Sequence, residues 1–199
     1  IVDTIKKYQE ENGTDQIKFR LETGNVGVMA ATNEEVSAAQ FTILIYVFTE
    51  IIILCLLTFC SLRATLAITL PLGLVSLLAY ALMTELEIGL KVSTLPVVAL
   101  GVGVGVDYGI YIYSRFQAHL NEGLTIYEAY HETLKVTGSG VLVTGITLAI
   151  GTATWIFSPL QFQADMGILL TFMFLLNMLG ALLLLPALAS WLLRRKKRA

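Results

Sequence analysis

Charged residues are scarce in this sequence. Asp, Glu, Lys and Arg make up 14% of its 199 residues, whereas a typical soluble domain has about 25%. Most of the charges lie before Val36, between Arg115 and Lys135, or from Arg194 onward. Hydrophobic residues account for 56% of the chain, and its mean hydropathy is +0.74. This distribution excludes a soluble globular domain and predicts an integral membrane protein.

Cysteine and histidine are also rare, with two of each. Cys55 and Cys60 lie in one apolar run, so we interpret them as small hydrophobic residues that form no disulfide. His119 and His131 lie in a polar loop, where we expect them to be solvated. The sequence therefore predicts no metal site and no cofactor. The basic run at the C-terminus is typical of a membrane anchor beside anionic lipid, and it does not indicate nucleic-acid binding.

Five segments are long enough to cross a membrane, since about 20 apolar residues span the hydrocarbon core as a helix. They are Phe41–Cys60, Ala64–Thr84, Val92–Ser114, Ser139–Phe157 and Met166–Leu193. We therefore predict an all-α polytopic membrane domain over residues 37–193. The last segment exceeds the required length, which predicts that it is tilted or protrudes.

Residues 1–36 are mixed and polar. Asp3–Glu11 resembles the end of a helix, and Gln16–Glu22 alternates apolar and polar residues in the manner of a strand. About 35 residues cannot bury a sufficient core alone, so we interpret this segment as the end of a larger extracytoplasmic α+β domain. Because the sequence starts at Ile1 without an initiator Met, we expect it to be a piece of a longer protein.

The basic residues predict the orientation of the chain. Residues 194–199 include a run of five Arg and Lys side chains, which favours a cytoplasmic C-terminal tail. Five crossings then place the N-terminal segment outside.

An amphipathic helix is predicted at about residues 124–136, in the cytoplasmic loop between the third and fourth spans. Thr125 and Glu128 have the spacing of a capping box. The helix is interpreted either as a lever that joins two moving bundles or as a connector at the membrane interface. The residues expected on its apolar face are Leu120, Leu124, Tyr127, His131 and Leu134.

Asp107 is the most informative residue, because it lies within the third predicted span. A charged group at membrane depth is costly, and acidic residues there often mark proton or ion pathways. Tyr108 is adjacent and can hydrogen-bond a carboxyl group on a facing helix. Asp107 and Tyr108 are therefore the predicted proton relay. The alternative is a permanently protonated Asp107 that only holds helices together.

Three glycines in the same span recur every four residues. Gly101, Gly105 and Gly109 therefore share one helical face, where a neighbouring helix can approach closely. Asp107 lies about 200° around the helix from Gly105 and points away from this face. The glycines do not predict a nucleotide loop, because they lie within a span and not between a strand and a helix.

Two other spans contain polar residues. Glu50, near the middle of the first span, is interpreted either as an auxiliary relay carboxylate or as a structural residue. Thr144 and Thr147 share a small polar face of the fourth span with Gly140 and Gly151. Their hydroxyls are candidates for an auxiliary relay with Asp107, and close helix packing is the alternative.

The segment Gly103–Tyr111 (GVGVDYGIY), followed by Ser114 and Arg115, resembles the central helix of the resistance-nodulation-division (RND) superfamily. The resemblance is strongest to its MMPL-type branch of hydrophobe and lipid exporters, relatives of Patched and the Niemann-Pick type C proteins. Thr23–Glu34 and Phe162–Gly167 support it. Drug-efflux relatives carry two adjacent acidic residues on one central helix and a lysine on the other. This sequence has neither feature, which favours the lipid-type branch.

The resemblance implies two repeats, each with one helix, a large extracytoplasmic domain and five further helices. This chain is similar to the end of the second repeat. Its implied partners are the first repeat, which is missing here and whose Asp-Tyr helix would face Asp107 and Tyr108, as well as protons, a hydrophobic or lipid substrate and membrane lipids. A homo-oligomer or a periplasmic protein is a further partner to consider. The implied location is the bacterial inner membrane, with a periplasmic N-terminal segment.

The resemblance therefore predicts a secondary transporter, not an enzyme, that exports hydrophobic or lipid-like substrates by proton antiport. The alternative is a lipid- or sterol-responsive receptor or assembly scaffold of the same fold, since one fold hosts many functions. An intramembrane aspartyl protease would need two facing carboxylates that share a proton. Only Glu50 is available to pair with Asp107, and the glycine spacing does not fit.

Overall fold

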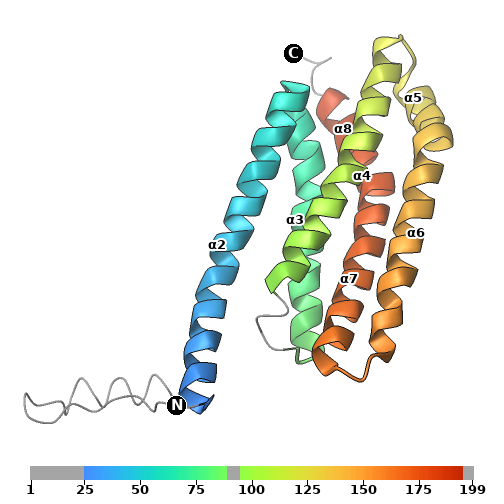
Figure 1. The fold of residues 1–199 in the computed structure, drawn as a ribbon. Helices are drawn as coiled ribbons and strands as arrows, with labels where there is room; N and C mark the ends of the chain where they lie inside the picture. Colours follow the sequence, from blue (N-terminus) through green and yellow to red (C-terminus); the bar gives the residue numbers. More distant parts are fainter. Residues whose placement is uncertain (1–24, 89–94, 195–199) are drawn as a thin grey trace, which may run out of the picture.

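The computed structural model describes residues 25–88 and 95–194, and all regular structure in these two ranges is helical (Figure 1). Two π-helical segments, η1 (Leu134–Gly138) and η3 (Gly180–Leu184), and a 3-10 turn, η2 (Thr154–Phe157), join some of the α-helices. The helix and the strand expected within residues 3–22 lie outside the described ranges. The α-helices are α2 (Asn25–Phe59), α3 (Leu62–Glu85), α4 (Leu95–Asn121), α5 (Ile126–Thr133), α6 (Ser139–Ala153), α7 (Gln161–Leu179) and α8 (Leu185–Arg194).

Five helical stretches in the described ranges are long and apolar enough to cross a membrane. They are Thr42–Phe59, Leu62–Glu85, Pro96–Asn121, Ile126–Phe157 and Gln161–Trp191. The prediction of an all-α polytopic membrane protein is therefore confirmed. Helices suit this setting because every backbone N–H and C=O can pair within its own segment, where lipid offers no partner.

Some element boundaries differ from the prediction. α2 begins at Asn25, so residues 25–36, which we assigned to an α+β domain, form a helix continuous with the first span. α2 ends at Phe59, beside Cys60 with its φ of +46°. The last span begins at Gln161 and contains η3. Hydropathy does not mark these positions, because a helix can continue through residues of any polarity.

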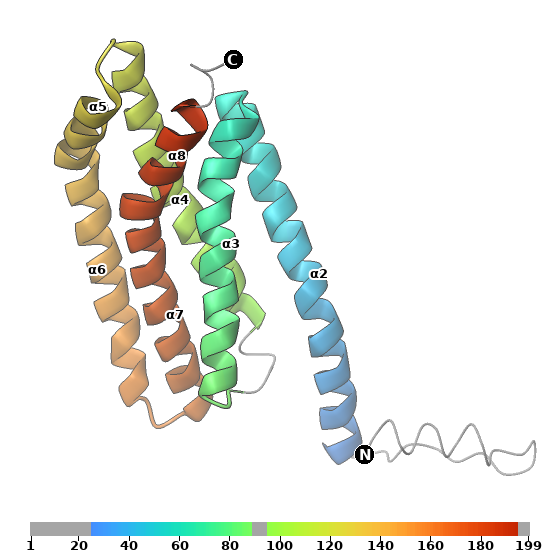
Figure 2. The same cartoon turned by 180° about the vertical axis from the view of Figure 1, so that it is seen from behind.

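The helices pack as one bundle from which α2 leans away toward its N-terminal end (Figures 1 and 2). α6 packs closely on α7, where a Cβ at Gly145 would lie 2.7 Å from the sulfur of Met178. The hydroxyls of Thr152 and Thr171 hydrogen-bond across the same contact at 2.9 Å. The start of α2 and the end of α8 lie at opposite ends of the bundle, as an odd number of crossings requires.

The amphipathic helix is present as α5, and its predicted apolar face is partly right. Leu120 and Leu124 pack against the core and Leu134 is half-buried, but the other two predicted residues are exposed. Tyr127 is 77% exposed, and His131 is exposed as well. Ala129 and Thr133 are the fully buried residues instead. Small side chains let α5 approach the bundle closely, so packing density decides which face is buried. The helix also continues directly through η1 into α6.

Candidate functional site

The helix α4 carries Asp107, and its glycine face lies against α3 and α7. A Cβ added at any of the three glycines would approach a neighbouring side chain closer than real Cβ atoms do. α4 can therefore lie this close to its neighbours only where these positions lack a side chain. The nearest atoms would be Met173 Sδ at 2.6 Å for Gly101, Asn177 Cγ at 2.5 Å for Gly105 and Ile68 Cγ2 at 2.9 Å for Gly109.

Asn177 fixes the register of α7 against α4. Its side chain is 4% exposed, and its Nδ2 donates a hydrogen bond to the Gly101 carbonyl oxygen at 2.7 Å. This hydrogen bond joins residues 76 positions apart in the sequence. A buried amide needs such a partner. The sequence analysis missed Asn177, although a lone amide in an otherwise apolar span was the available signal.

The opposite side of α4 faces an open groove shared with η1 and α6. Asp107 and Tyr108 line this groove together with Thr144 of α6. Its volume is about 550 Å³, which is enough for several water molecules. The residues that complete its lining are Val104, Tyr111, Arg115, Val136, Thr137, Gly140, Val141 and Leu148.

The two relay candidates differ in exposure but share a lack of partners. The Asp107 side chain is exposed to the groove, and no hydrogen bond or ion pair joins it to another described residue. Tyr108 is 4% exposed, and its hydroxyl is a buried polar atom without a hydrogen-bond partner among the described residues. Buried hydroxyls are normally paired, so the Tyr108 hydroxyl is an exception among the described residues.

The structure does not bring every relay candidate to the groove. Glu50 is exposed on α2 and does not line it. Thr147 is also outside the lining, and its hydroxyl donates to the Val143 carbonyl oxygen of its own helix at 2.8 Å. Of the three auxiliary residues predicted, only Thr144 shares the groove with Asp107 and Tyr108.

The small polar face of α6 is open in this structure. A Cβ added at Gly140 or Gly151 would meet no atom within 4 Å, and Thr144 and Thr147 are exposed. The helix packs on α7 through a different face, which includes Gly145 and Ala149. Close packing at the predicted face is therefore not seen against any described part of the chain.

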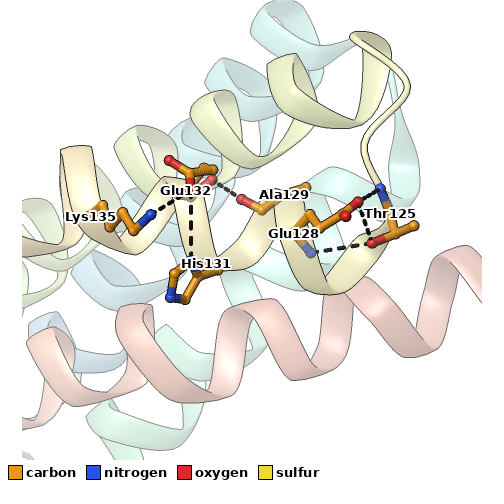
Figure 3. A network of polar contacts seen from close by, with 7 residues as sticks. Thr125, Glu128, Ala129, His131, Glu132 and Lys135 are labelled. Atoms are coloured by element: carbon orange, nitrogen blue, oxygen red, sulfur yellow. Dashed lines mark hydrogen bonds and ion pairs between the residues drawn. The ribbon is translucent and has the colours of Figure 1, made fainter.

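A polar network organises α5 and the start of η1, in the polar loop that precedes the apolar part of the fourth span (Figure 3). Thr125 and Glu128 form the predicted capping box, in which the Glu128 carboxylate accepts from the Thr125 backbone N–H at 3.0 Å. Further along, Lys135 donates to Glu132 at 2.7 Å. This contact is the main reason why the pKa of Glu132 is lowered. α5 lies at the same end of the bundle as the C-terminal end of α4.

We expect α5 to lose its N-terminal cap in acid. Hydrogen bonds from the Thr125 backbone and hydroxyl lower the pKa of Glu128 below its ordinary value of 4.5. Because the pKa is lower in the folded state, the cap stabilises α5 above pH 4.5, and this effect is lost as the pH falls through the folded-state value. Amide hydrogen exchange in the first turn of α5, corrected for intrinsic rates, should therefore lose protection in acid.

Two variants sharpen this measurement. In Glu128→Gln, the protection of the first turn should no longer depend on pH in this range. Glu132→Gln removes a neighbouring acid with a lowered pKa but leaves the cap intact, so it should keep the pH dependence of the parent chain. Identical behaviour of the two variants would contradict the role of the capping box.

The geometry around Asp107 suits proton transfer better than metal chemistry. No group of three or more His, Cys, Asp or Glu residues is placed to hold a metal within residues 25–88 and 95–194. A carboxyl group that is open to a groove with room for water can instead accept and release a proton. The other polar side chains at the groove are hydroxyls and the Arg115 guanidinium.

The fold and the site define a polytopic α-helical membrane protein in which α4 presents a carboxyl group to an open groove. The chain belongs to the MMPL family, whose model matches residues 4–199. This match confirms the resemblance inferred from the segment around Asp107.

Several known proteins are similar to part of the chain. A membrane protein of Streptomyces coelicolor, SCO6666, is 31% identical over 58% of this chain and 16% of its own length. The Methanocaldococcus jannaschii membrane protein MJ1562 is 31% identical over 53% of this chain and 27% of its own length. A Mycobacterium leprae protein named "Probable trehalose monomycolate exporter MmpL3" is 32% identical over 46% of this chain and 10% of its own length. The chain thus spans about a quarter or less of these relatives.

Proposed function

We propose that this chain is the C-terminal membrane part of a proton-driven exporter of hydrophobic or lipid-like molecules. The observation that carries the proposal is that Asp107 and Tyr108 line the same groove, Asp107 with an exposed carboxyl and Tyr108 with a buried hydroxyl that has no partner among the described residues. Membership of the MMPL family and similarity to a protein named as an exporter support it. The proposed location is a bacterial inner membrane.

The proposed mechanism uses the protonation state of Asp107 to choose between two helix arrangements. A charged carboxylate favours water and hydrogen-bond donors in the groove, whereas a neutral carboxyl tolerates closure of the groove. One proton that crosses 100 mV releases about 2.3 kcal/mol, which changes a two-state equilibrium about fiftyfold. Such a bias is sufficient to alternate the transporter between its two arrangements.

The proposed partner is the first repeat of the same transporter. It would cover the open α6 face that contains Thr144, Thr147 and Gly151, and it would bring a partner to the Tyr108 hydroxyl. In the proposed orientation, the end of the bundle that carries α5 and Arg194 is cytoplasmic, and the start of α2 is periplasmic. The basic tail after α8 supports this orientation.

Infrared spectroscopy of the complete transporter in liposomes tests the proposal directly. We expect a carboxyl band that changes with pH and is missing in Asp107→Asn. We also expect the band to survive in Glu50→Gln, which removes another acid from a spanning helix but not from the groove. A carboxyl that stays protonated at every pH would overturn the proton relay and favour a receptor or scaffold of the same fold.

A further inference from the structure

A hydrogen bond links α5 to the last span at a carbonyl whose usual helical donor, the N–H four residues on, is missing. The Tyr130 hydroxyl donates to the Leu182 carbonyl oxygen at 2.9 Å, across 52 residues of sequence. Leu182 lies four residues before Pro186, and proline has no N–H with which to form the usual helical bond to that carbonyl. Tyr130 therefore supplies a donor where Pro186 cannot, and the surrounding segment η3 is π-helical.

The donor is held in place by the packing of its own helix. Tyr130 lies between Ala129, which is fully buried, and Thr133, which is also fully buried. The capping box at Thr125 fixes the start of the same helix. With both ends of α5 anchored, the Tyr130 hydroxyl is a preorganised donor, so the bond costs little additional ordering.

The side chain of Leu182 lies close to Gly138 in η1, next to the η1 residues that line the groove. A Cβ at Gly138 in η1 would lie 3.5 Å from Leu182 Cδ2. Val136 and Thr137 of η1 line the groove that holds Asp107. Leu182 thus meets α5 through its carbonyl and η1 through its side chain, and η1 is the segment that joins α5 to α6.

We propose that Tyr130 is a positioning residue that couples the Pro186 region of the last span to the η1 wall of the groove. Its hydroxyl holds the last span in register with α5 and η1. The position of η1 in turn determines where its residues Val136 and Thr137 lie relative to Asp107. The consequence for transport rests on the proposed function. The mechanical coupling of η1 and η3 does not depend on the proposed function.

Hydrogen–deuterium exchange of the complete transporter in liposomes tests the coupling. Tyr130→Phe keeps the ring and removes only the hydroxyl, so amide exchange in both η1 and η3 should become about fivefold faster, the usual scale for one hydrogen bond. Tyr127→Phe is the matched control: Tyr127 lies on the same helix, is 77% exposed, and should leave both segments unchanged.

A rescue variant separates the bond from a general loss of packing. Pro186→Ala returns a backbone N–H within reach of the Leu182 carbonyl, so in the Tyr130→Phe background it should restore slow exchange in η3. It should not restore slow exchange in η1, which still lacks its hydrogen-bonded link to the last span. Equal exchange in Tyr130→Phe and Tyr127→Phe would overturn the proposal, as would a return of slow exchange in η1 when Pro186→Ala is added. If the exchange results hold while Asp107→Asn still transports, the exporter proposal fails and this one stands.

Discussion

Replacing Asp107 with asparagine should abolish pH-gradient-driven export. An asparagine side chain is not a proton acceptor at any physiological pH, so the two helix arrangements would no longer be biased by the proton gradient. We expect the transport rate to fall at least about a hundredfold, the scale on which an essential proton-transfer group contributes. The measurement is uptake of a fluorescent acyl-lipid probe into liposomes that contain the complete transporter in inverted orientation and carry an imposed pH gradient.

The fold of the Asp107→Asn variant should be unaffected. Asparagine has nearly the same volume as aspartate, and the side chain at position 107 is exposed to the groove without a partner among the described residues. The melting temperature should therefore stay within about 2 °C of the parent value. Glu50→Gln is the control for loss of an acid from a spanning helix, and it should retain transport. Transport by Asp107→Asn at the parent rate would contradict the proton relay.

Replacing Gly105 with valine should destabilise the bundle more than any other single change to the glycine face. The first added atom would lie 2.5 Å from Asn177 Cγ and 2.6 Å from Leu72 Cδ2. Asn177 cannot move aside without losing the hydrogen bond from its amide to the Gly101 carbonyl oxygen. At Gly101, by contrast, the nearest atoms belong to the flexible end of Met173.

We expect Gly105→Val to cost about 3 kcal/mol through overpacking and the strained amide contact. For a domain of this size, that corresponds to a fall in melting temperature of about 6–12 °C. Gly73→Val is the matched control, since a Cβ at Gly73 would meet no atom within 4 Å. The melting temperatures of both variants are measured on the purified proteins by monitoring thermal unfolding with fluorescence. Equal melting temperatures for the two variants would show that the α4 contact is looser than described.

The spans and the relay helix could be predicted from the sequence because their signals are local. A run of about 20 apolar residues must form a helix in lipid, since no other backbone arrangement satisfies its own polar groups. Asp107 stood out for a similar reason: its charge conflicts with the apolar run around it. The spacing of Gly101, Gly105 and Gly109 placed them on one face, because the helical repeat is known in advance.

The partners of these residues could not be predicted, because they depend on contacts between distant segments. Thr144 and Thr147 are alike in sequence, yet only Thr144 reaches the groove, because the rotation of α6 is set by its packing on α7. Nor could the sequence show that Asn177 pairs with Gly101. The buried face of α5 was predicted only in part, since the small residues Ala129 and Thr133 are fully buried whereas Tyr127 is exposed.

The sequence by itself therefore determined that this protein is helical, crosses a membrane and carries a lone acid on a glycine-lined span, because each property follows from neighbouring residues and the solvent around them. The tertiary structure alone decided which side chains share the groove with Asp107, and it alone brought Tyr130 to the carbonyl that Pro186 leaves without its helical donor. Helix rotation and register are set by close packing between segments far apart in the chain, and local periodicity does not encode them.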